Sequence, residues 1–183
     1  PRSTLFPYTT LFRSEESEAR ILHLKGIVFY LRGAFEEAIG AFERLLLIDA
    51  SRCDLYWNIA RAFHWANDSQ NEIANYRRLL AIEPHSFKAC AALGYALLVA
   101  GDLDESIHYL SQATQLADRS TPVYFNLGLA YYFKEDYERA VGSLRRSISA
   151  KDDDFRAWHL LASAQIKMGD IESAAGSIRV FLQ

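Results

Sequence analysis

The sequence is poor in cysteine and lacks any long hydrophobic run. Cys53 and Cys90 are the two cysteines among 183 residues, and neither has the CxxC spacing or the neighbouring histidines that a zinc site needs. We therefore expect free thiols rather than a disulfide framework or a metal site. A membrane-spanning helix needs roughly 20 consecutive apolar residues, and no segment approaches that length. Membrane insertion is therefore not expected, although 50% of the residues are hydrophobic.

Motifs for catalysis and for cofactor binding are also missing. The patterns GxGxxG, HExxH, GxSxG and the P-loop do not occur, and the five histidines have no metal-ligand spacing to one another. We predict no catalytic residue, no cofactor and no bound metal. With 20 basic and 23 acidic residues the formal net charge is -3, so the chain lacks the basic character of a nucleic-acid-binding protein.

Residues 1–14 differ in composition from the rest of the chain. They read PRSTLFPYTTLFRS, follow no helical period and contain no acidic residue, whereas an acidic lead-in at residues 15–18 follows directly. The string closely resembles the translation of a sequencing-library adapter, and we interpret it as an artefact. A targeting peptide is the alternative interpretation.

The main feature that the sequence does contain is an internal repeat of 34 residues. Successive segments align without insertion or deletion, and they begin at Ala19, Cys53, Phe87, Thr121 and Phe155. Position 8 of each segment is Gly or Ala, and position 24 is a large apolar residue. Small residues allow two helices to approach closely, and positions 24 and 27 share one helical face. Each segment therefore predicts a pair of packed helices.

The residues that recur at equivalent positions of the segments resemble the pattern of the tetratricopeptide-repeat (TPR) family. The resemblance rests on a large residue at position 4, such as Tyr124, and on Leu-Gly at positions 7 and 8, as in Leu127-Gly128. It covers residues 19–183 and implies an all-α fold, a right-handed TPR-type α-solenoid of antiparallel helix pairs with about ten helices in all. The repeats would span residues 19–52, 53–86, 87–120 and 121–154, with a truncated fifth repeat at 155–183.

Short turns are predicted in the middle of the repeats. Gly33, Gly101, Glu135 and Gly169 lie at these places, where the chain needs residues that tolerate tight turns. The second repeat has no glycine there, and it carries Glu72 at position 20, which is Ala or Ser in the other repeats. We expect the stem of Glu72 to pack and its carboxylate to reach water, because an unpaired buried carboxylate is costly. Splaying of this helix pair is the alternative.

Neither end of the array has the polar-faced capping helix that usually closes a helical solenoid. We therefore expect a fragment of a longer protein whose first and last repeats leave their stacking surfaces bare. Such surfaces would allow self-association through the end repeats.

The resemblance also implies a binding groove. In TPR proteins the first helix of each repeat lines a concave surface, through positions 2, 5, 6, 9, 12 and 13. These positions predict a peptide-binding groove formed by His23, Ile27, Tyr30, Trp57, Asn58, Arg61, His64, Trp65, Lys88, Tyr95, Leu98, Phe125, Asn126, Leu129, Tyr132, Phe133 and His159. The groove is rich in aromatic residues, and large exposed apolar surfaces usually mark contact sites. The alternative is that neighbouring repeats bury these side chains.

We therefore predict a non-catalytic protein–protein interaction module that binds an extended peptide or a helix of a partner in this groove. Asn58 and Asn126 suit an extended peptide, because an amide both donates to and accepts from any peptide backbone. The groove lacks most of the residues of the TPR clamp for two carboxylates, so EEVD-type tails are not expected to bind. Two alternatives stay open: a regulatory or substrate-docking arm of an enzyme such as a glycosyltransferase or kinase, and a structural assembly scaffold. We expect a protein or peptide partner, no nucleic acid and a cytoplasmic location.

Overall fold

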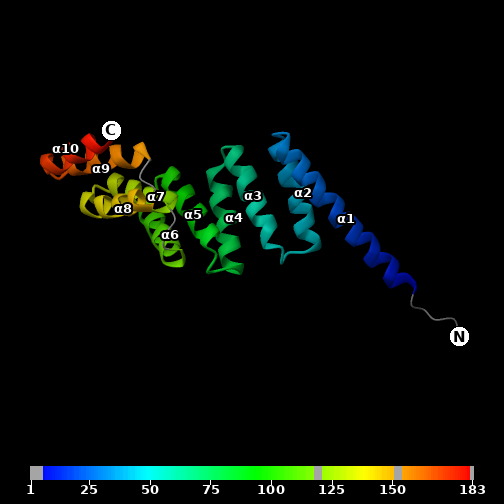
Figure 1. The fold of residues 1–183 in the computed structure, drawn as a ribbon. Helices are drawn as coiled ribbons and strands as arrows, with labels where there is room; N and C mark the ends of the chain where they lie inside the picture. The colour runs from blue at the N-terminus through cyan, green and yellow to red at the C-terminus, as the bar shows by residue number, and fades with distance from the viewer. Residues whose placement is uncertain (1–5, 118–120, 151–153, 182–183) are drawn as a thin grey trace. The chain divides into compact units, whose positions relative to one another are not determined.

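The computed structural model describes residues 6–117, 121–150 and 154–181, and these residues form ten helices and no strand. The chain divides into two compact units, residues 1–84 and 85–183. The first unit contains α1 (Phe6–Leu31), α2 (Phe35–Ile48), α3 (Cys53–Trp65) and α4 (Ser69–Ile82) (Figure 1). The second contains α5 (Phe87–Ala100), α6 (Leu103–Leu116), α7 (Thr121–Phe133), α8 (Tyr137–Ala150), α9 (Phe155–Lys167) and α10 (Ile171–Phe181). The all-α prediction is confirmed.

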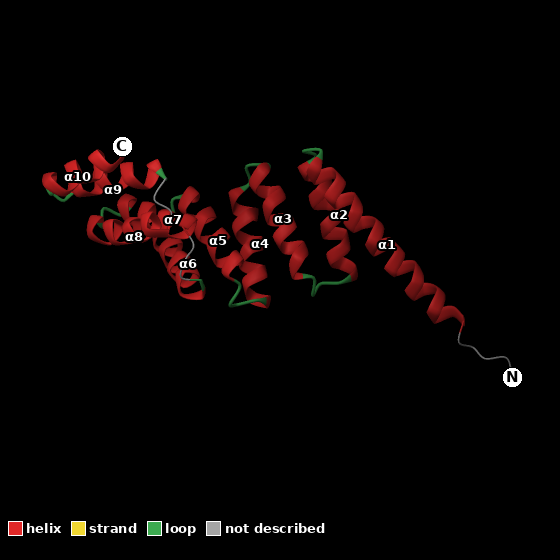
Figure 2. Ribbon diagram, viewed as in Figure 1, coloured by secondary structure: helices red, strands yellow, loops and turns green. Residues whose placement is uncertain are grey.

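Helices pack in hairpins that are joined by short loops (Figure 2). In the first unit α1 packs on α2 and α3 on α4, and in the second unit α5 packs on α6, α7 on α8 and α9 on α10. The second helix of one pair also packs on the first helix of the next, as in α2 on α3, α6 on α7 and α8 on α9. The helices α3, α5, α7 and α9 begin at intervals of 34 residues.

The first helix is longer than the repeat pattern implies. It begins at Phe6, so residues 6–14 are helical although they show no helical period in the sequence. Residues 1–5 lie outside the described part of the chain.

Small residues at position 8 allow each hairpin to close. A Cβ atom placed on Gly94 would lie 2.6 Å from Cγ of Leu110, and one on Gly128 would lie 2.7 Å from Cγ of Leu144. Leu110 and Leu144 are fully buried. Glycine therefore occurs where the first helix of the pair touches a large side chain of the second.

The turns inside the hairpins adopt the left-handed conformation that the sequence indicated. Gly33, Gly101 and Gly169 have φ values of 77°, 88° and 81°. The two turns without glycine place Asn67 and Glu135 at φ values of 58° and 62°. Asn is among the residues that accept this region most readily, whereas Glu adopts it at some cost in strain.

The expectation for Glu72 is wrong. Its side chain does not reach water, because the residue is 6% exposed and Oε2 lies 3.2 Å from Nδ1 of His64. The helix α4 stays paired with α3. Pairing with a histidine eight residues earlier explains how a carboxylate occupies a position that holds a small residue in the other repeats.

Two further expectations concern the cysteines and insertion into a membrane. Cys53 and Cys90 are both free thiols, as expected. Within the described residues, none of the helices combines the length and the apolar character that crossing a membrane requires.

Candidate functional site

Several residues of the predicted groove come together in the first unit. Nε1 of Trp65, at the end of α3, donates a hydrogen bond to the hydroxyl oxygen of Tyr30 at 2.9 Å. The ring of Phe35 stacks on Trp65, with centroids 6.5 Å apart and 17° between the ring planes. The guanidinium of Arg61 lies over Tyr30, with Cζ 5.1 Å from the ring centroid. We call Tyr30, Phe35, Arg61 and Trp65 the aromatic cluster.

The aromatic cluster is fixed in position but remains open to solvent. Trp65 is 58% exposed although its indole is held by a hydrogen bond and a stacked ring, and Arg61 is also exposed. Side chains held in one rotamer lose little conformational entropy when a ligand covers them. Because the indole N–H is already bonded to Tyr30, the part of Trp65 that remains available is its apolar ring.

Three other predicted residues of the first unit, Trp57, Asn58 and His64, are half-buried. The ring of Trp57 packs on Tyr76 with centroids 5.5 Å apart, and burial raises the pKa of the Tyr76 hydroxyl. His64 meets Trp65 edge-on at 5.5 Å and pairs with Glu72 on its other side. These side chains support the unit from within and offer less surface than Trp65 does.

At the other end of the predicted first-unit surface, His23 has a polar partner that the sequence did not indicate. Nδ1 of His23 lies 3.0 Å from Nη2 of Arg52. Arg52 also binds both carboxylate oxygens of Asp54, at 2.8 and 2.6 Å, and its hydrogen bonds lower the pKa of Asp54. The nearby Ile27 is partly exposed.

The sequence analysis did not identify Arg52 and Phe35. It predicted the groove only from positions in the first helix of each repeat, and both residues lie outside those positions.

In the second unit, Phe125 is covered on one side by a cation. Cζ of Arg156 lies 5.1 Å from the Phe125 ring centroid. Asp154 holds this guanidinium with hydrogen bonds of 3.0 and 2.9 Å, and the same bonds lower the pKa of Asp154. Tyr132 meets Tyr137 edge-on at 5.6 Å. Both predicted aromatic residues are therefore half-buried by contacts within the unit.

The remaining predicted residues of the second unit differ widely in accessibility. Those that are exposed are Lys88, Tyr95, Phe133 and His159, and those that are half-buried are Asn126 and Leu129. Leu98 is buried and packs inside the unit instead of facing solvent. Packing between helices therefore removes some of the predicted surface, while a part that includes Phe133 stays accessible.

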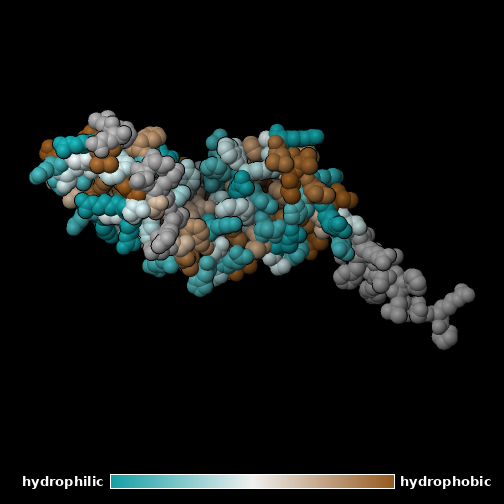
Figure 3. All heavy atoms as spheres, viewed as in Figure 1, coloured by the Kyte–Doolittle hydropathy of each residue, from teal (hydrophilic) through white to brown (hydrophobic). Residues whose placement is uncertain are grey.

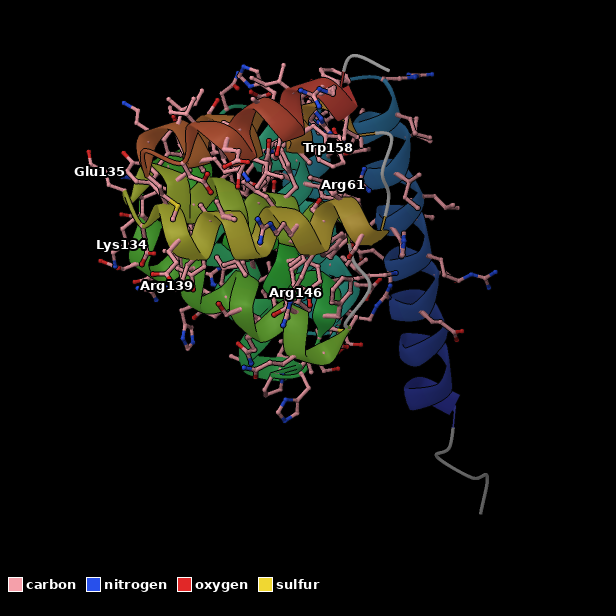
Figure 4. The ribbon with its side chains drawn as sticks, turned by 60° about the vertical axis from the view of Figure 1, so that its left-hand side comes forward. Arg61, Lys134, Glu135, Arg139, Arg146 and Trp158 are labelled. Atoms are coloured by element: carbon pink, nitrogen blue, oxygen red, sulfur yellow. The ribbon has the colours of Figure 1, made fainter. Side chains whose placement is uncertain are left out.

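Two arrangements lie outside the predicted groove. Arg146 of α8, labelled in Figure 4, has its Cζ 5.6 Å from the centroid of the Tyr124 ring. A pocket of about 480 Å³ lies between α8, α9 and α10, and Trp158, Leu161 and Val180 contribute to its walls. No group of His, Cys, Asp and Glu side chains able to hold a metal ion occurs among the described residues.

Comparison with known proteins agrees with the repeat pattern. The family model for the tetratricopeptide repeat matches residues 87–119, 121–154 and 155–175. The chain is 25% identical over 126 residues to tetratricopeptide repeat protein 8 of Caenorhabditis elegans, a match that covers 68% of this chain and 25% of that protein. The chain thus spans a quarter of the length of this curated relative.

Solved structures show the same fold. A crystal structure of MamA protein has a TM-score of 0.88 at 20% sequence identity and covers 91% of both chains. YrrB, described as a TPR protein with an unusual peptide-binding site, has a TM-score of 0.82 at 13% identity, over 96% of this chain and 91% of YrrB. The family model shows that residues 87–175 consist of tetratricopeptide repeats, and the solved structures share the fold of the helix hairpins with their 34-residue spacing.

Proposed function

We propose that this chain is a protein–protein interaction module whose first unit binds a peptide segment of a partner protein on the aromatic cluster. The observation that carries the proposal is the state of Trp65, whose ring is fixed by Tyr30 and Phe35 and is nevertheless 58% exposed. Trp and Arg side chains contribute most to binding energy at many protein interfaces. A partner that covered Trp65 and Arg61 together would bury one of each.

The chemistry of the aromatic cluster indicates which peptides it suits. The indole ring of Trp65 offers an apolar face, whereas its N–H is used within the unit. The exposed guanidinium of Arg61 offers donors to a carbonyl or a carboxylate. We therefore expect a peptide that places an apolar side chain on Trp65 and a hydrogen-bond acceptor near Arg61.

Relatives support the general assignment. The matched family describes a helical repeat rather than an enzyme domain, and YrrB, one of the structural neighbours, is described as having a peptide-binding site. The proposal therefore contains binding and no catalytic step.

A random-peptide display library selected on the full chain supplies probes for this proposal. The selected peptides are then titrated calorimetrically against the wild type and against Trp65→Ala. Loss of a central tryptophan typically costs more than about 1 kcal/mol, so the dissociation constant is expected to rise at least about fivefold.

Phe155→Ala is the matched control, because Phe155 is a similarly exposed aromatic residue outside the aromatic cluster. It is expected to leave the affinity unchanged. The proposal is wrong if the library yields no binding peptide, or if the selected peptides bind Trp65→Ala as tightly as they bind the wild type.

A further inference from the structure

The pocket between α8, α9 and α10 lies inside the second unit and has a volume of about 480 Å³. From α8 it is lined by Arg145 and Ile148, from α9 by Trp158 and Leu161, and from α10 by Val180 among others. In Figure 3, apolar side chains reach the surface among polar ones over α9 and α10. Pockets that hold small organic ligands have volumes of about 300–1,000 Å³, so this pocket is large enough for one.

The preceding pair of repeats fills the equivalent place with arginine side chains. Cζ of Arg139 lies 4.9 Å from the centroid of the Tyr131 ring, and Cζ of Arg146 lies 5.6 Å from the centroid of the Tyr124 ring. Figure 4 labels both arginines on α8. They occupy positions 19 and 26 of the fourth repeat, and the two tyrosines occupy positions 11 and 4. Each guanidinium therefore covers a ring of the helix behind it.

The fifth repeat has no arginine at these positions. Ser173 and Val180 occupy positions 19 and 26, and both line the pocket. Positions 4 and 11 are Trp158 and Gln165, which line it as well. Because serine and valine are shorter than arginine, the space that the guanidinium groups occupy in the fourth repeat stays open in the fifth.

A following repeat does not cover this side of a second helix. Arg139, Gly142 and Arg146 of α8 are exposed although α9 follows α8 and packs on it. These residues occupy positions 19, 22 and 26, the positions through which α10 lines the pocket. The opening of the pocket therefore does not depend on the part of the chain after α10.

A buried side chain of the pocket has an unpaired hydrogen-bond donor. Gln165 is 3% exposed and lines the pocket. Its Oε1 accepts a hydrogen bond from Oγ of Ser177 at 2.8 Å, whereas its Nε2 has no partner among the described residues. Because a buried donor without a partner is costly, a ligand that brings an oxygen acceptor to Nε2 gains affinity.

Arg145 gives the pocket a positive charge. Its side chain is exposed and forms no hydrogen bond or ion pair among the described residues. Hydrogen bonds with Ser173 lower the pKa of Asp170 and the charge of Arg145 adds to this effect, but Asp170 and Arg145 form no ion pair. The described residues that line the pocket include no Asp or Glu. A guanidinium binds a carboxylate through two parallel hydrogen bonds, so the pocket favours such an anion.

We propose that this pocket binds an apolar carboxylic acid that carries a second oxygen acceptor. The apolar body packs against Trp158, Leu161 and Val180. The carboxylate pairs with Arg145, and the second acceptor takes the hydrogen bond of Nε2 of Gln165. A free small acid and the C-terminal residue of a polypeptide both have this chemistry. The site lies in the second unit and is independent of the aromatic cluster.

N-acetylphenylalanine is the probe, because it combines a ring, a carbonyl oxygen and a carboxylate. It is titrated into the isotope-labelled full chain and followed by NMR. The side-chain amide signals of Gln165 should shift in a saturable way, since Nε2 gains an acceptor. These signals are identified by their absence from the spectrum of Gln165→Glu. N-acetylphenylalaninamide, which lacks the charge, should bind about fivefold more weakly, the upper end for an exposed ion pair.

Gly176→Leu fills the pocket and should abolish the shifts. Gly176 lines the pocket, and a Cβ there would meet nothing within 4 Å, so the new side chain does not displace the neighbouring helices. Gly142→Leu is the matched control. It places the same side chain at the same position of the fourth repeat, where a Cβ would also meet nothing within 4 Å, and it should bind like the wild type. Leucine is a better helix former than glycine, so both variants should fold.

A peptide that ends in phenylalanine with a free carboxylate distinguishes the two sources of the ligand. If it binds more tightly than N-acetylphenylalanine, the residues before its end add contacts and the ligand is the end of a polypeptide. If it binds more weakly, the pocket holds a free small acid. In both cases Gly176→Leu should abolish binding.

Arg145→Gln tests the role of the charge. It should weaken binding of the acid about fivefold and leave binding of the amide unchanged. Trp65→Ala should bind the probe like the wild type, which separates this site from the aromatic cluster. The proposal is overturned if the signals of Gln165 do not shift, or if Gly176→Leu binds N-acetylphenylalanine as tightly as Gly142→Leu does.

Discussion

Gly94→Ala is a direct test of the close approach between α5 and α6. The new Cβ would lie 2.6 Å from Cγ and 2.9 Å from Cδ2 of Leu110, and 3.1 Å from the backbone nitrogen of Leu110. Carbon atoms pack at about 3.5–4.0 Å, so either Leu110 changes its rotamer or the two helices separate. Separation would also strain the buried hydrogen bond that Ser106 donates to the carbonyl oxygen of Gly94 at 2.7 Å.

The expected magnitude follows from two opposing effects. Overpacking of this kind costs about 1–3 kcal/mol. Alanine is a better helix former than glycine by about 1 kcal/mol, which offsets part of that cost. We therefore expect Gly94→Ala to lower the free energy of unfolding by about 1 kcal/mol, with an upper limit of about 2 kcal/mol.

Urea denaturation of the full chain, followed by circular dichroism, measures the effect. Gly142→Ala is the matched control, because Gly142 lies within α8 of the same unit and a Cβ there would meet nothing within 4 Å. Gly142→Ala should stabilise the unit by about 1 kcal/mol through helix propensity alone.

A double-mutant cycle identifies the cause. Leu110→Ala removes the colliding atoms at a cost of about 2–5 kcal/mol, and Gly94→Ala should then become stabilising in that background. Gly94→Ala that is as stable as Gly142→Ala, or additive effects in the cycle, would refute the packing argument.

Three other predictions concern Glu72, the peptide surface and Trp57. Burial raises the pKa of Glu72 above its ordinary value of 4.5, so the folded state binds this proton more tightly and stability falls as pH rises through the raised pKa. Urea midpoints of Glu72→Gln should therefore exceed those of the wild type at neutral pH and match them at acidic pH. Titration with an EEVD-terminated peptide should show no binding, and micromolar affinity would contradict this prediction. Trp57→Ala should lower the free energy of unfolding by about 2 kcal/mol, roughly half the cost of removing a fully buried tryptophan, and an unchanged urea midpoint would argue against the packing of Trp57 on Tyr76.

The sequence determined the helix hairpins because the signals for them are local or strictly periodic. Repetition at 34 residues placed equivalent helices in equivalent segments, and helices begin at Cys53 and Phe87 where two of those segments begin. Turn chemistry was equally readable, since a glycine such as Gly101 marks a place where the chain needs a positive φ. The leader shows the limit of this approach, because residues 6–14 form the N-terminal part of α1 although their sequence has no helical period.

The candidate site required the tertiary structure because its members lie on different helices. Position columns placed Trp65 and Leu98 on the same predicted surface, but packing leaves Trp65 exposed and buries Leu98. The prediction used only positions in the first helix of each repeat. It therefore omitted Phe35, which lies on α2 and stacks on Trp65. Which side chains stay open depends on how far neighbouring helices approach each other, and that distance is set by side chains from several repeats at once.

What the sequence decided by itself is therefore the repeat, its helices and its turns, together with the residues that could face a partner. The tertiary structure decided which of these residues are exposed. It placed Glu72 against His64 instead of in water, and it fixed Trp65 between Tyr30 and Phe35. Periodicity indicates on which face of its helix a residue lies. Whether the side chain is exposed, and which side chains it contacts, depends on the helix that covers that face.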